Sequence, residues 1–329
     1  MSLLSVIHLS VEYPSDKGRL RVVDDVSFSI EPGEILALIG ESGCGKSVAC
    51  RAILRLLPGR NGRIASGRID FAGRDIARLP EAELIGYRGR QIAMIFQNAE
   101  TFFDPAMTIG EQLSEALEFH EGLGRSEARR LILDLLEQVG VPDAQRCLDR
   151  YPRQLSAGMR WRAMIAAGLS RSPKLLIVDE PGAGLDTTVR AQIVRLLLDI
   201  RDRTGIAMIL LTHDLGSVAQ ICDSVAVMYA GRIVERAPKS ELLRQPLHPY
   251  SEALLHARPD ARATGDGLLP ELRGEPPSLA DLPRGCRFHP RCPYADDACR
   301  FGDVQLTEVS SWRATACRHW ERMMSGVSS

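Results

Sequence analysis

The most informative segment of the chain is Gly40-Glu41-Ser42-Gly43-Cys44-Gly45-Lys46-Ser47. It follows the short apolar run Ile35–Ile39, which has the pattern of a strand buried on both faces. A helical stretch begins at Lys46 and continues to Leu57. Glycines allow the backbone N–H groups of such a turn to point inward around an anion, and the helix N-terminus adds a partial positive charge. The segment therefore predicts a phosphate-binding turn between a strand and a helix.

Strand and helix patterns alternate along the rest of the chain. Residues 6–12 alternate as a strand, Tyr13–Leu20 predicts a loop or hairpin, and Val26–Ile30 predicts a second strand. A mainly helical block at residues 98–170 interrupts the pattern and suggests an inserted subdomain. The alternation indicates an α/β domain with a largely parallel sheet. Further strands are expected at Leu175–Asp179, Ile206–Thr212 and Val225–Tyr229, and helices at Ile109–Glu121, Ser126–Val139 and Thr188–Arg203.

Composition excludes some classes of protein. The 329 residues include 41 Lys and Arg against 42 Asp and Glu, so the net charge of −1 gives no support for bulk nucleic-acid binding. No apolar run reaches the roughly 18 residues that span a bilayer, and the N-terminus lacks the pattern of a secretory signal. We expect a soluble, cytosolic chain that works at a membrane only by docking onto another chain.

A second acidic motif suits the chemistry of a bound triphosphate. Leu175–Asp179 is an apolar strand that ends in two acids, Asp179 and Glu180. An aspartate at a strand tip can hold Mg²⁺ through water, and the next acid can polarise an attacking water molecule. Taken alone, the pair could equally be a solvated strand end. Its combination with the phosphate-binding turn favours the functional interpretation.

These segments resemble a known family. The phosphate-binding turn, Leu175–Glu180 and Leu155-Ser156-Ala157-Gly158-Met159 are similar to the Walker A, Walker B and signature motifs of ABC ATPases. The resemblance implies a P-loop NTPase (RecA-like) core with an inserted helical subdomain at about 98–170 and an antiparallel β subdomain. We expect this nucleotide-binding domain to occupy residues 1–245.

The resemblance also implies roles for single residues. Gln97 resembles the Q-loop glutamine that senses Mg²⁺ and contacts the transmembrane partner, His213 the switch histidine at the γ-phosphate, and Tyr13 the aromatic residue that stacks on adenine. Taken singly, these could be a surface glutamine, a strand-end histidine and a tyrosine packed on the sheet. Lys46 is expected to reach the β and γ phosphates. The expected ATP-binding residues are Tyr13, Gly40, Ser42, Gly43, Cys44, Gly45, Lys46, Ser47, Val48, Ser156 and Gly158; the Mg²⁺ ligands are Ser47, Gln97 and Asp179; the catalytic residues are Glu180, His213 and Gln97.

In this family the signature closes over ATP bound to an opposite subunit, so the resemblance implies a working pair of ATPase domains. The present signature departs from the common Leu-Ser-Gly-Gly-Gln at Ala157 and Met159, and Trp161 stands where Gln or Arg is common. The segment 182–186 reads Gly-Ala-Gly-Leu-Asp where Thr-Thr-Ala-Leu-Asp is common in the D-loop. The departures lower the expected activity of the site that this signature completes and favour a heterodimer.

After about residue 245 the sequence changes to a separate, proline-rich and loop-rich appendage, residues 246–329. Together with Pro246–Tyr250, its cysteines resemble the C-terminal region of oligopeptide and dipeptide importer ATPases. Groups of four cysteines in the C-terminal region of this family resemble the ligands of a [4Fe-4S] cluster. The spacing differs from the paired C-x-x-C of zinc ribbons, although His289 and His319 permit a mixed zinc site, and reduced thiols without metal are a third interpretation. The four cysteines are Cys286, Cys292, Cys299 and Cys317.

We therefore expect an ATP-hydrolysing subunit of a peptide importer, with ATP and Mg²⁺ and a [4Fe-4S] cluster as cofactors. Its expected partners are two transmembrane permease subunits, a second ABC ATPase and an external substrate-binding protein, at the cytoplasmic face of the cell membrane. Nickel, glutathione or other small solutes are alternative cargoes. A soluble ABC ATPase without a transport role is the alternative function. Such proteins carry long coiled-coil arms, zinc modules or a tandem second domain, and we find no pattern for any of these in this sequence.

Overall fold

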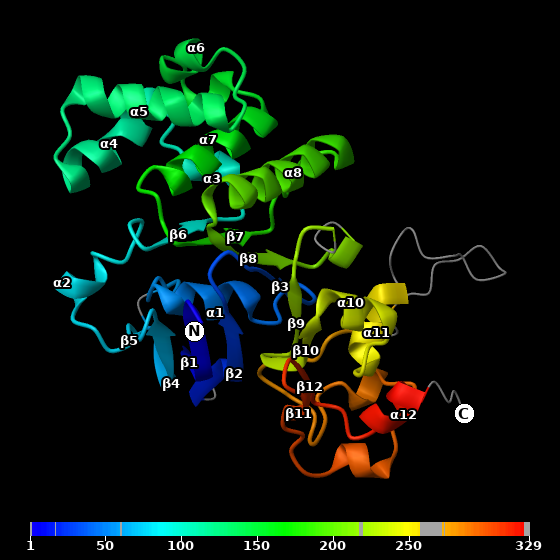
Figure 1. Ribbon diagram of the computed structural model, residues 1–329. Coiled ribbons are helices and arrows are strands. Elements are labelled where there is room, and N and C mark those ends of the chain that lie inside the picture. The colour runs from blue at the N-terminus through cyan, green and yellow to red at the C-terminus, as the bar shows by residue number, and fades with distance from the viewer. Residues whose placement is uncertain are drawn as a thin grey trace. The chain divides into compact units, whose positions relative to one another are not determined.

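The computed structural model describes residues 2–16, 18–59, 61–216, 220–256, 272 and 274–325. The chain divides into two compact units (Figure 1). The first unit combines Met1–Leu79 with Leu211–Ser329, and the second is Pro80–Leu210. The division falls inside strand β8, Ala207–Thr212. Mixed sheets and helices confirm the expected α/β class.

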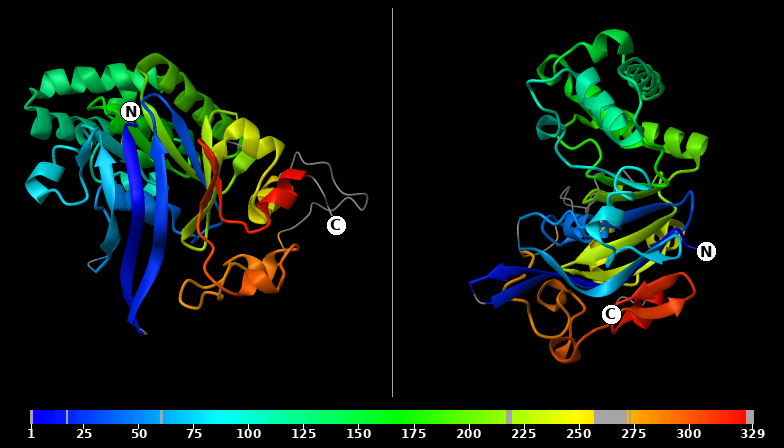
Figure 2. Two further views of the ribbon diagram at one scale, coloured as in Figure 1. Left: turned by 60° about the horizontal axis from the view of Figure 1, so that its bottom comes forward. Right: turned by 90° about the vertical axis from the view of Figure 1, so that its left-hand side faces the viewer.

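The first unit contains an antiparallel sheet in the order β2-β1-β4-β5. Figure 2 shows the long pair formed by β1 and β2, which a short turn connects as expected for Tyr13–Leu20. His8 and Asp25 interrupt the register as a bulge: both have positive φ, and His8 Nδ1 lies 2.6 Å from Asp25 Oδ1. The antiparallel β subdomain is thus present. Its strands are β1 (Leu4–Ser15), β2 (Gly18–Ile30), β4 (Arg63–Phe71) and β5 (Arg74–Asp75).

A parallel pair of strands leads into the phosphate-binding turn. Strand β3 (Ile35–Ile39) pairs in parallel with β9 (Ser224–Tyr229), and all five residues of β3 are buried, as its apolar run predicts. Helix α1 (Lys46–Ile53) follows but ends before the expected Leu57. It ends because Arg55 adopts a positive φ of 51°, so that the N–H groups of Arg55 and Leu56 cap the carbonyl oxygens of Ala52 and Arg51.

The C-terminal residues add two strands to the edge of this sheet. Strand β12 pairs antiparallel with β10, and β11 pairs with β12. The sequence pattern did not predict these strands, because three or four residues are too few to show a period. The remaining tail is loop-rich, as expected. The elements are β10 (Arg232–Pro238), α10 (Lys239–Arg244), α11 (Pro249–His256), η2 (His289–Arg291), η3 (Asp297–Arg300), β11 (Thr307–Ser310), β12 (Arg313–Thr315) and α12 (Trp320–Ser325).

An aromatic cluster joins the tail to β9. Tyr229 packs against Tyr250, with ring centroids 4.6 Å apart, and against Phe288 at 5.2 Å. The fully buried Glu235 of β10 accepts the backbone N–H groups of Leu247 at 2.7 Å and His248 at 2.9 Å. The buried carboxyl group of Glu235 therefore fixes the start of α11, the helix that carries Tyr250.

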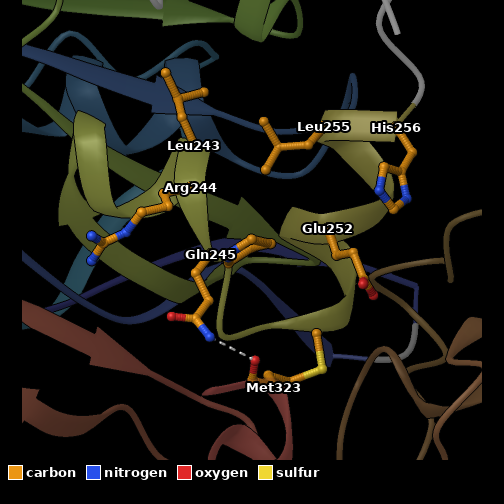
Figure 3. A pocket seen from close by; sticks show the side chains of 8 residues that line it. Leu243, Arg244, Gln245, Glu252, Leu255, His256 and Met323 are labelled. Atoms are coloured by element: carbon orange, nitrogen blue, oxygen red, sulfur yellow. Dashed lines mark hydrogen bonds between the residues drawn. The ribbon is translucent and has the colours of Figure 1, made fainter. Parts of the chain in front are cut away.

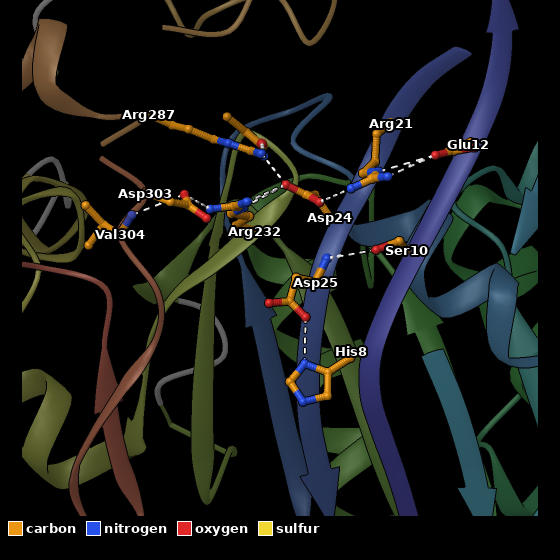
Figure 4. A network of polar contacts seen from close by, with 11 residues as sticks. His8, Ser10, Glu12, Arg21, Asp24, Asp25, Arg232, Arg287, Asp303 and Val304 are labelled. Carbon is orange, nitrogen blue, oxygen red and sulfur yellow. Dashed lines mark hydrogen bonds and ion pairs between the residues drawn. The ribbon is translucent and has the colours of Figure 1, made fainter. Parts of the chain in front are cut away.

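A network of ion pairs attaches the tail to β2 as well (Figure 4). The carboxylate of Asp24 accepts hydrogen bonds from Arg21 at 3.0 Å, from Arg232 at 2.8 Å and from Arg287. Burial opposes the charge of Asp24, but the hydrogen bonds from Arg21 and Arg232 outweigh it and lower its pKa. Residues from three distant parts of the sequence thus share one buried carboxylate.

A cavity of about 520 Å³ lies among α10, α11 and α12 (Figure 3). Gln245 closes one side, where its amide donates to the Met323 carbonyl oxygen at 3.2 Å. None of the ATP-binding residues or cysteines expected from the sequence lines it. The lining residues are Leu243, Arg244, Gln245, Pro246, Glu252, Leu255, His256 and Met323.

The second unit is mainly helical around two parallel strands, β6 and β7. The expected helices agree with α4, α5 and α8 within one or two residues. Helix α4 begins at a capping box of Thr108 and Glu111. Among the described residues, none of the helices has the length and apolar character needed to cross a membrane. The elements are α2 (Glu81–Leu84), β6 (Ile92–Ile95), α3 (Ala99–Phe102), α4 (Ile109–Glu121), α5 (Arg125–Gln138), α6 (Ala144–Leu148), η1 (Pro152–Gln154), α7 (Ala157–Leu169), β7 (Leu175–Asp179) and α8 (Thr187–Thr204).

The buried His248 predicts a loss of stability in mild acid. Burial lowers the pKa of His248 to about 3, whereas the pKa of a histidine in an unfolded chain is about 6.5. As pH falls below the unfolded value, the unfolded chain binds a proton that the folded chain does not. This group therefore removes about 1.4 kcal/mol of the free energy of unfolding per pH unit between the two values.

The variant His248→Asn tests this expectation, because an asparagine can accept the Tyr250 N–H that His248 Nδ1 accepts at 3.1 Å, and it does not titrate. Urea unfolding at neutral pH and at about pH 5 should show a smaller stability loss for His248→Asn than for the parent by about 2 kcal/mol. The exposed His120 provides the matched control, His120→Asn, which should retain the parental pH dependence. Equal losses in the parent and His248→Asn would contradict the assignment.

Candidate functional site

The phosphate-binding turn has a backbone that only glycine satisfies at two positions. A side chain at Gly40 would place its Cβ 2.1 Å from the Met228 carbonyl oxygen of β9. Gly45, which caps α1, has φ of 108°, and a Cβ there would lie 2.8 Å from the Val22 carbonyl oxygen. The turn therefore lies directly against neighbouring main chain, which excludes a side chain at either position.

Lys46 is held against the first residues of the turn. Its Nζ donates to the carbonyl oxygens of Gly40 at 2.6 Å and Glu41 at 3.0 Å, and it lies 3.8 Å from Cys44 Sγ. Lys46 and Cys44 are both buried, and burial raises the pKa of the Cys44 thiol. Ser42 and Gly43 are exposed, while Ser47 and Val48 are half-buried in the first turn of α1.

The remainder of the chain holds this turn by contacts that local sequence patterns do not predict. The Gly40 N–H donates to the Thr212 carbonyl oxygen at 3.3 Å, next to the exposed His213. The Cys44 carbonyl oxygen accepts the Gly231 N–H at 2.9 Å. The first contact places the expected switch histidine beside the chain segment that begins the turn.

Tyr13 occupies the end of β1 and is half-buried. Its ring lies close to Gly62, where an added Cβ would be 2.7 Å from Tyr13 Cε1. The hydroxyl is buried and has no hydrogen-bond partner among the described residues. The ring thus packs against main chain on one side, and adenine stacking stays a prediction.

In the second unit, two parallel strands place three expected site residues at the same edge: two expected Mg²⁺ ligands and the acid expected to polarise the attacking water. Strands β6 and β7 are in register from Ile92 with Leu175 to Ile95 with Val178. The exposed Gln97 follows β6, and the buried Asp179 ends β7. Glu180 comes next and adopts a positive φ of 50°, a conformation that is uncommon outside glycine and found at functional sites.

Two helix caps shape the signature and D-loop segments. The Ser156 hydroxyl accepts the Met159 N–H at 3.2 Å and caps α7, and Asp186 caps α8 in the same way through Val189. Gly158 lies close to Val189, 3.1 Å from an added Cβ. Trp161 is fully buried, and its Nε1–H donates to the Ala183 carbonyl oxygen at 3.3 Å. The unusual tryptophan therefore forms a hydrogen bond with the backbone of the unusual D-loop segment.

The four tail cysteines converge in the first unit. Cys286, Cys292, Cys299 and Cys317 line one cavity together with Phe288 and His319. Burial raises the pKa of Cys292 to about 11 and of Cys317 to about 12, and the nearby thiols add to both shifts. The thiols are thus near enough to influence one another although the first and the last are 31 positions apart in the sequence.

A smaller group of metal-type ligands adjoins this cavity. Asp296, Cys299 and His319 offer ligand atoms that all lie within 4.8 Å of one another. His319 Nε2 lies 3.1 Å from Asp296 Oδ2 and 3.5 Å from Cys299 Sγ. His289 instead directs its Nδ1 to the Cys286 carbonyl oxygen at 2.9 Å. Of the two histidines expected to permit a mixed zinc site, His319 has the more suitable neighbours.

The bond between Trp161 and Ala183 leads to a prediction. Trp161→Phe removes the indole donor from the partly buried carbonyl oxygen of Ala183, so it should lower the free energy of unfolding by about 0.5–1.5 kcal/mol. Chemical denaturation of the purified chain measures the difference. Trp312 is 66% exposed, so Trp312→Phe is the matched control and should change stability little. An equal effect of the two substitutions would show that the hydrogen bond between Trp161 and Ala183 is unimportant.

Comparison with known proteins adds to this geometry. Residues 23–183 match the family model "ABC transporter", and residues 234–299 match "oligopeptide/dipeptide transporter, C-terminal region". A probable peptide ABC transporter ATP-binding protein of Sinorhizobium fredii is 44% identical over 96% of this chain and 94% of that protein. The dipeptide transport ATP-binding protein DppD of Escherichia coli is 42% identical over 97% of both chains.

Solved structures agree on the fold. The ATP-binding cassette MJ0796, in a dimeric post-hydrolysis state bound to ADP and phosphate, has a TM-score of 0.64 at 22% identity and covers 72% of this chain and 98% of that one. CbiO1 from Clostridium perfringens has a TM-score of 0.63 at 28% identity, over 74% of this chain and 91% of that one. The expected P-loop core is thereby confirmed. The chain belongs to the ABC transporter family, among the ATP-binding proteins that carry the oligopeptide/dipeptide transporter C-terminal region.

Proposed function

We propose that this chain is the ATP-hydrolysing subunit of an importer that carries peptides through partner permeases. The observation that carries the proposal is the presence, in one structural unit, of the phosphate-binding turn and the C-terminal region typical of oligopeptide and dipeptide transporters. The relatives named for peptide and dipeptide transport match almost the whole chain. Nickel, glutathione and other small solutes are alternative cargoes that the ATPase subunit itself does not contact.

The residues have distinct roles in the proposed reaction. The turn amides and Lys46 bind the phosphates of ATP, and Ser47, Asp179 and Gln97 hold Mg²⁺ directly or through water. Glu180 accepts the proton of the water that attacks the γ-phosphorus, and ADP leaves as the bond to the γ-phosphoryl group breaks. His213 contacts the γ-phosphate, and Tyr13 stacks on adenine.

We propose that the chain acts in a pair with a second, non-identical ABC ATPase. Ser156 and Gly158 then contact ATP held by that partner, because the N-terminus of α7 is an anion site. The pair docks onto two permease subunits at the cytoplasmic face of the membrane and works with an external substrate-binding protein. The departures at Ala157 and Gly182 favour a partner with the common motifs, whose signature completes the site of this chain.

We further propose that the four tail cysteines hold a [4Fe-4S] cluster. Their thiols line one cavity, which suits a cofactor with several ligands. In a tetrahedral zinc site with zinc–sulphur bonds of about 2.3 Å, the ligand atoms would lie about 4 Å apart. Among the described residues, the group whose ligand atoms all lie within 4.8 Å of one another contains one cysteine rather than four. This spacing favours a larger cluster over a four-cysteine zinc site. When bound, the cluster supplies four iron–thiolate bonds that cross-link the tail.

Glu180→Gln tests the enzymatic proposal. The amide cannot accept the proton of water, so ATPase turnover of the assembled transporter should fall at least about 100-fold. Mg-ATP should still bind, because the phosphate-binding turn is unchanged, and equilibrium binding measures this separately. The exposed Glu137 of α5 supplies the control Glu137→Gln, which should retain turnover. Substantial ATPase activity in Glu180→Gln would refute the role of Glu180.

Metal analysis of protein purified without oxygen tests the cluster. We expect about four iron atoms per chain with a broad visible absorbance. Cys292→Ser should lower the iron content, whereas Cys147→Ser, at a buried cysteine of α6, should not. Colourless, iron-free protein would contradict the proposal, and one zinc per chain would instead support a mixed site at Asp296, Cys299 and His319.

A further inference from the structure

Every polar group of Glu41, the second residue of the phosphate-binding turn, has a partner. Its N–H donates to the Tyr250 hydroxyl at 2.9 Å, and its carbonyl oxygen accepts from Lys46 at 3.0 Å. Its carboxylate accepts two hydrogen bonds from Arg291, at 2.7 Å and 3.0 Å. Its carbonyl oxygen also accepts the Cys44 N–H at 3.3 Å. Tyr250 and Arg291 come from the C-terminal region, 209 and 250 residues further along the chain.

Arg291 is well placed to act on the turn. Its side chain is only 4% exposed, and it holds the Glu41 carboxylate in the two-pronged geometry that fixes both position and orientation. The guanidinium also lies over the Tyr229 ring, 5.8 Å from its centroid, and donates to the Tyr229 hydroxyl at 3.4 Å. A side chain buried and oriented in this way keeps few alternative positions.

A second arginine of the same segment holds the other end of the turn. Arg287 donates to the Ala230 carbonyl oxygen at 2.5 Å and binds Asp24 (Figure 4). The next residue, Gly231, donates its N–H to the Cys44 carbonyl oxygen at 2.9 Å. The segment between Cys286 and Cys292 therefore reaches the turn at Glu41 directly and at Cys44 through the β9–β10 connection.

We propose that Arg291 is a positioning residue for ATP binding: by holding Glu41, it fixes the start of the phosphate-binding turn, so that the C-terminal region contributes to nucleotide affinity. The turn binds phosphate through main-chain N–H groups. The orientation of the backbone at Glu41 determines the directions in which the N–H groups of the following residues point. Fixing that orientation before ATP arrives removes an ordering cost from binding. The inference rests on the proposed function, because it assumes that this turn binds ATP.

A double-mutant cycle on the purified full-length chain tests the proposal. The variants are Arg291→Met, Glu41→Gln and the two combined, with Arg291→Lys as the conservative variant. Titration calorimetry gives the dissociation constant of Mg-ATP, and thermal unfolding without nucleotide gives the stability. The matched control is Arg236→Met, which removes an arginine that pairs with Glu308 between β10 and β11.

Each single substitution should weaken Mg-ATP binding about tenfold, since each removes hydrogen bonds between charged groups. The double variant should bind about as weakly as either single variant, because both act through one contact. Arg291→Lys should recover part of the affinity through its remaining charge. Arg236→Met should keep the parental affinity even where its melting temperature falls.

Three results would overturn the positioning role. They are parental affinity in Arg291→Met, additive losses of about a hundredfold in the double variant, and a loss of affinity in Arg236→Met as large as that in Arg291→Met. If Arg291→Met does not fold, Glu41→Gln and Arg291→Lys examine the same contact from both sides. A parent chain that does not bind Mg-ATP would instead refute the proposed function, so the two failures can be told apart.

Discussion

The structure depends on close main-chain approach at the phosphate-binding turn. The Met228 carbonyl oxygen of β9 lies where a side chain of Gly40 would begin, and Gly45 must adopt φ of 108° to start α1. These constraints require β3 and β9 to be adjacent and in fixed register, which the parallel pairing from Leu36 to Ile39 provides. A buried, apolar β3 is therefore a condition of the chemistry as well as of the core.

Local patterns predicted the elements that local forces determine. The bounds of β3, α4 and β7 agree with the sequence interpretation to the residue, because buried apolar runs and the Thr108 capping box mark them. The end of α1 was predicted four residues too late, since the sequence pattern does not show the positive φ of Arg55. The candidate site shows the same limit. Motifs identified the turn itself, whereas its supports at Tyr250 and Arg291 lie too far along the chain for any periodicity to connect them.

The tail shows how a loop-rich segment acquires a fixed structure. It has little periodicity, yet the buried Glu235 binds the start of α11, and Tyr229 packs against Tyr250 and Phe288. Asp24 adds a third attachment through Arg287. These contacts with residues outside the tail hold it in place, although the described part of the tail itself has little regular secondary structure. Because Arg291 of the same tail binds Glu41, the tail also contributes to the arrangement of the phosphate-binding turn.

Some of the departures from the common family motifs, at Trp161 and in the segment 182–184, form one connected arrangement. Gly182 and Gly184 have φ of 74° and 76°, so the threonine and alanine that are common at these positions would be strained here. A side chain at Gly182 would also lie 2.8 Å from Arg190 Cγ. Between the two glycines, Ala183 accepts the hydrogen bond of the equally unusual Trp161. Three unusual residues thus stabilise one backbone conformation.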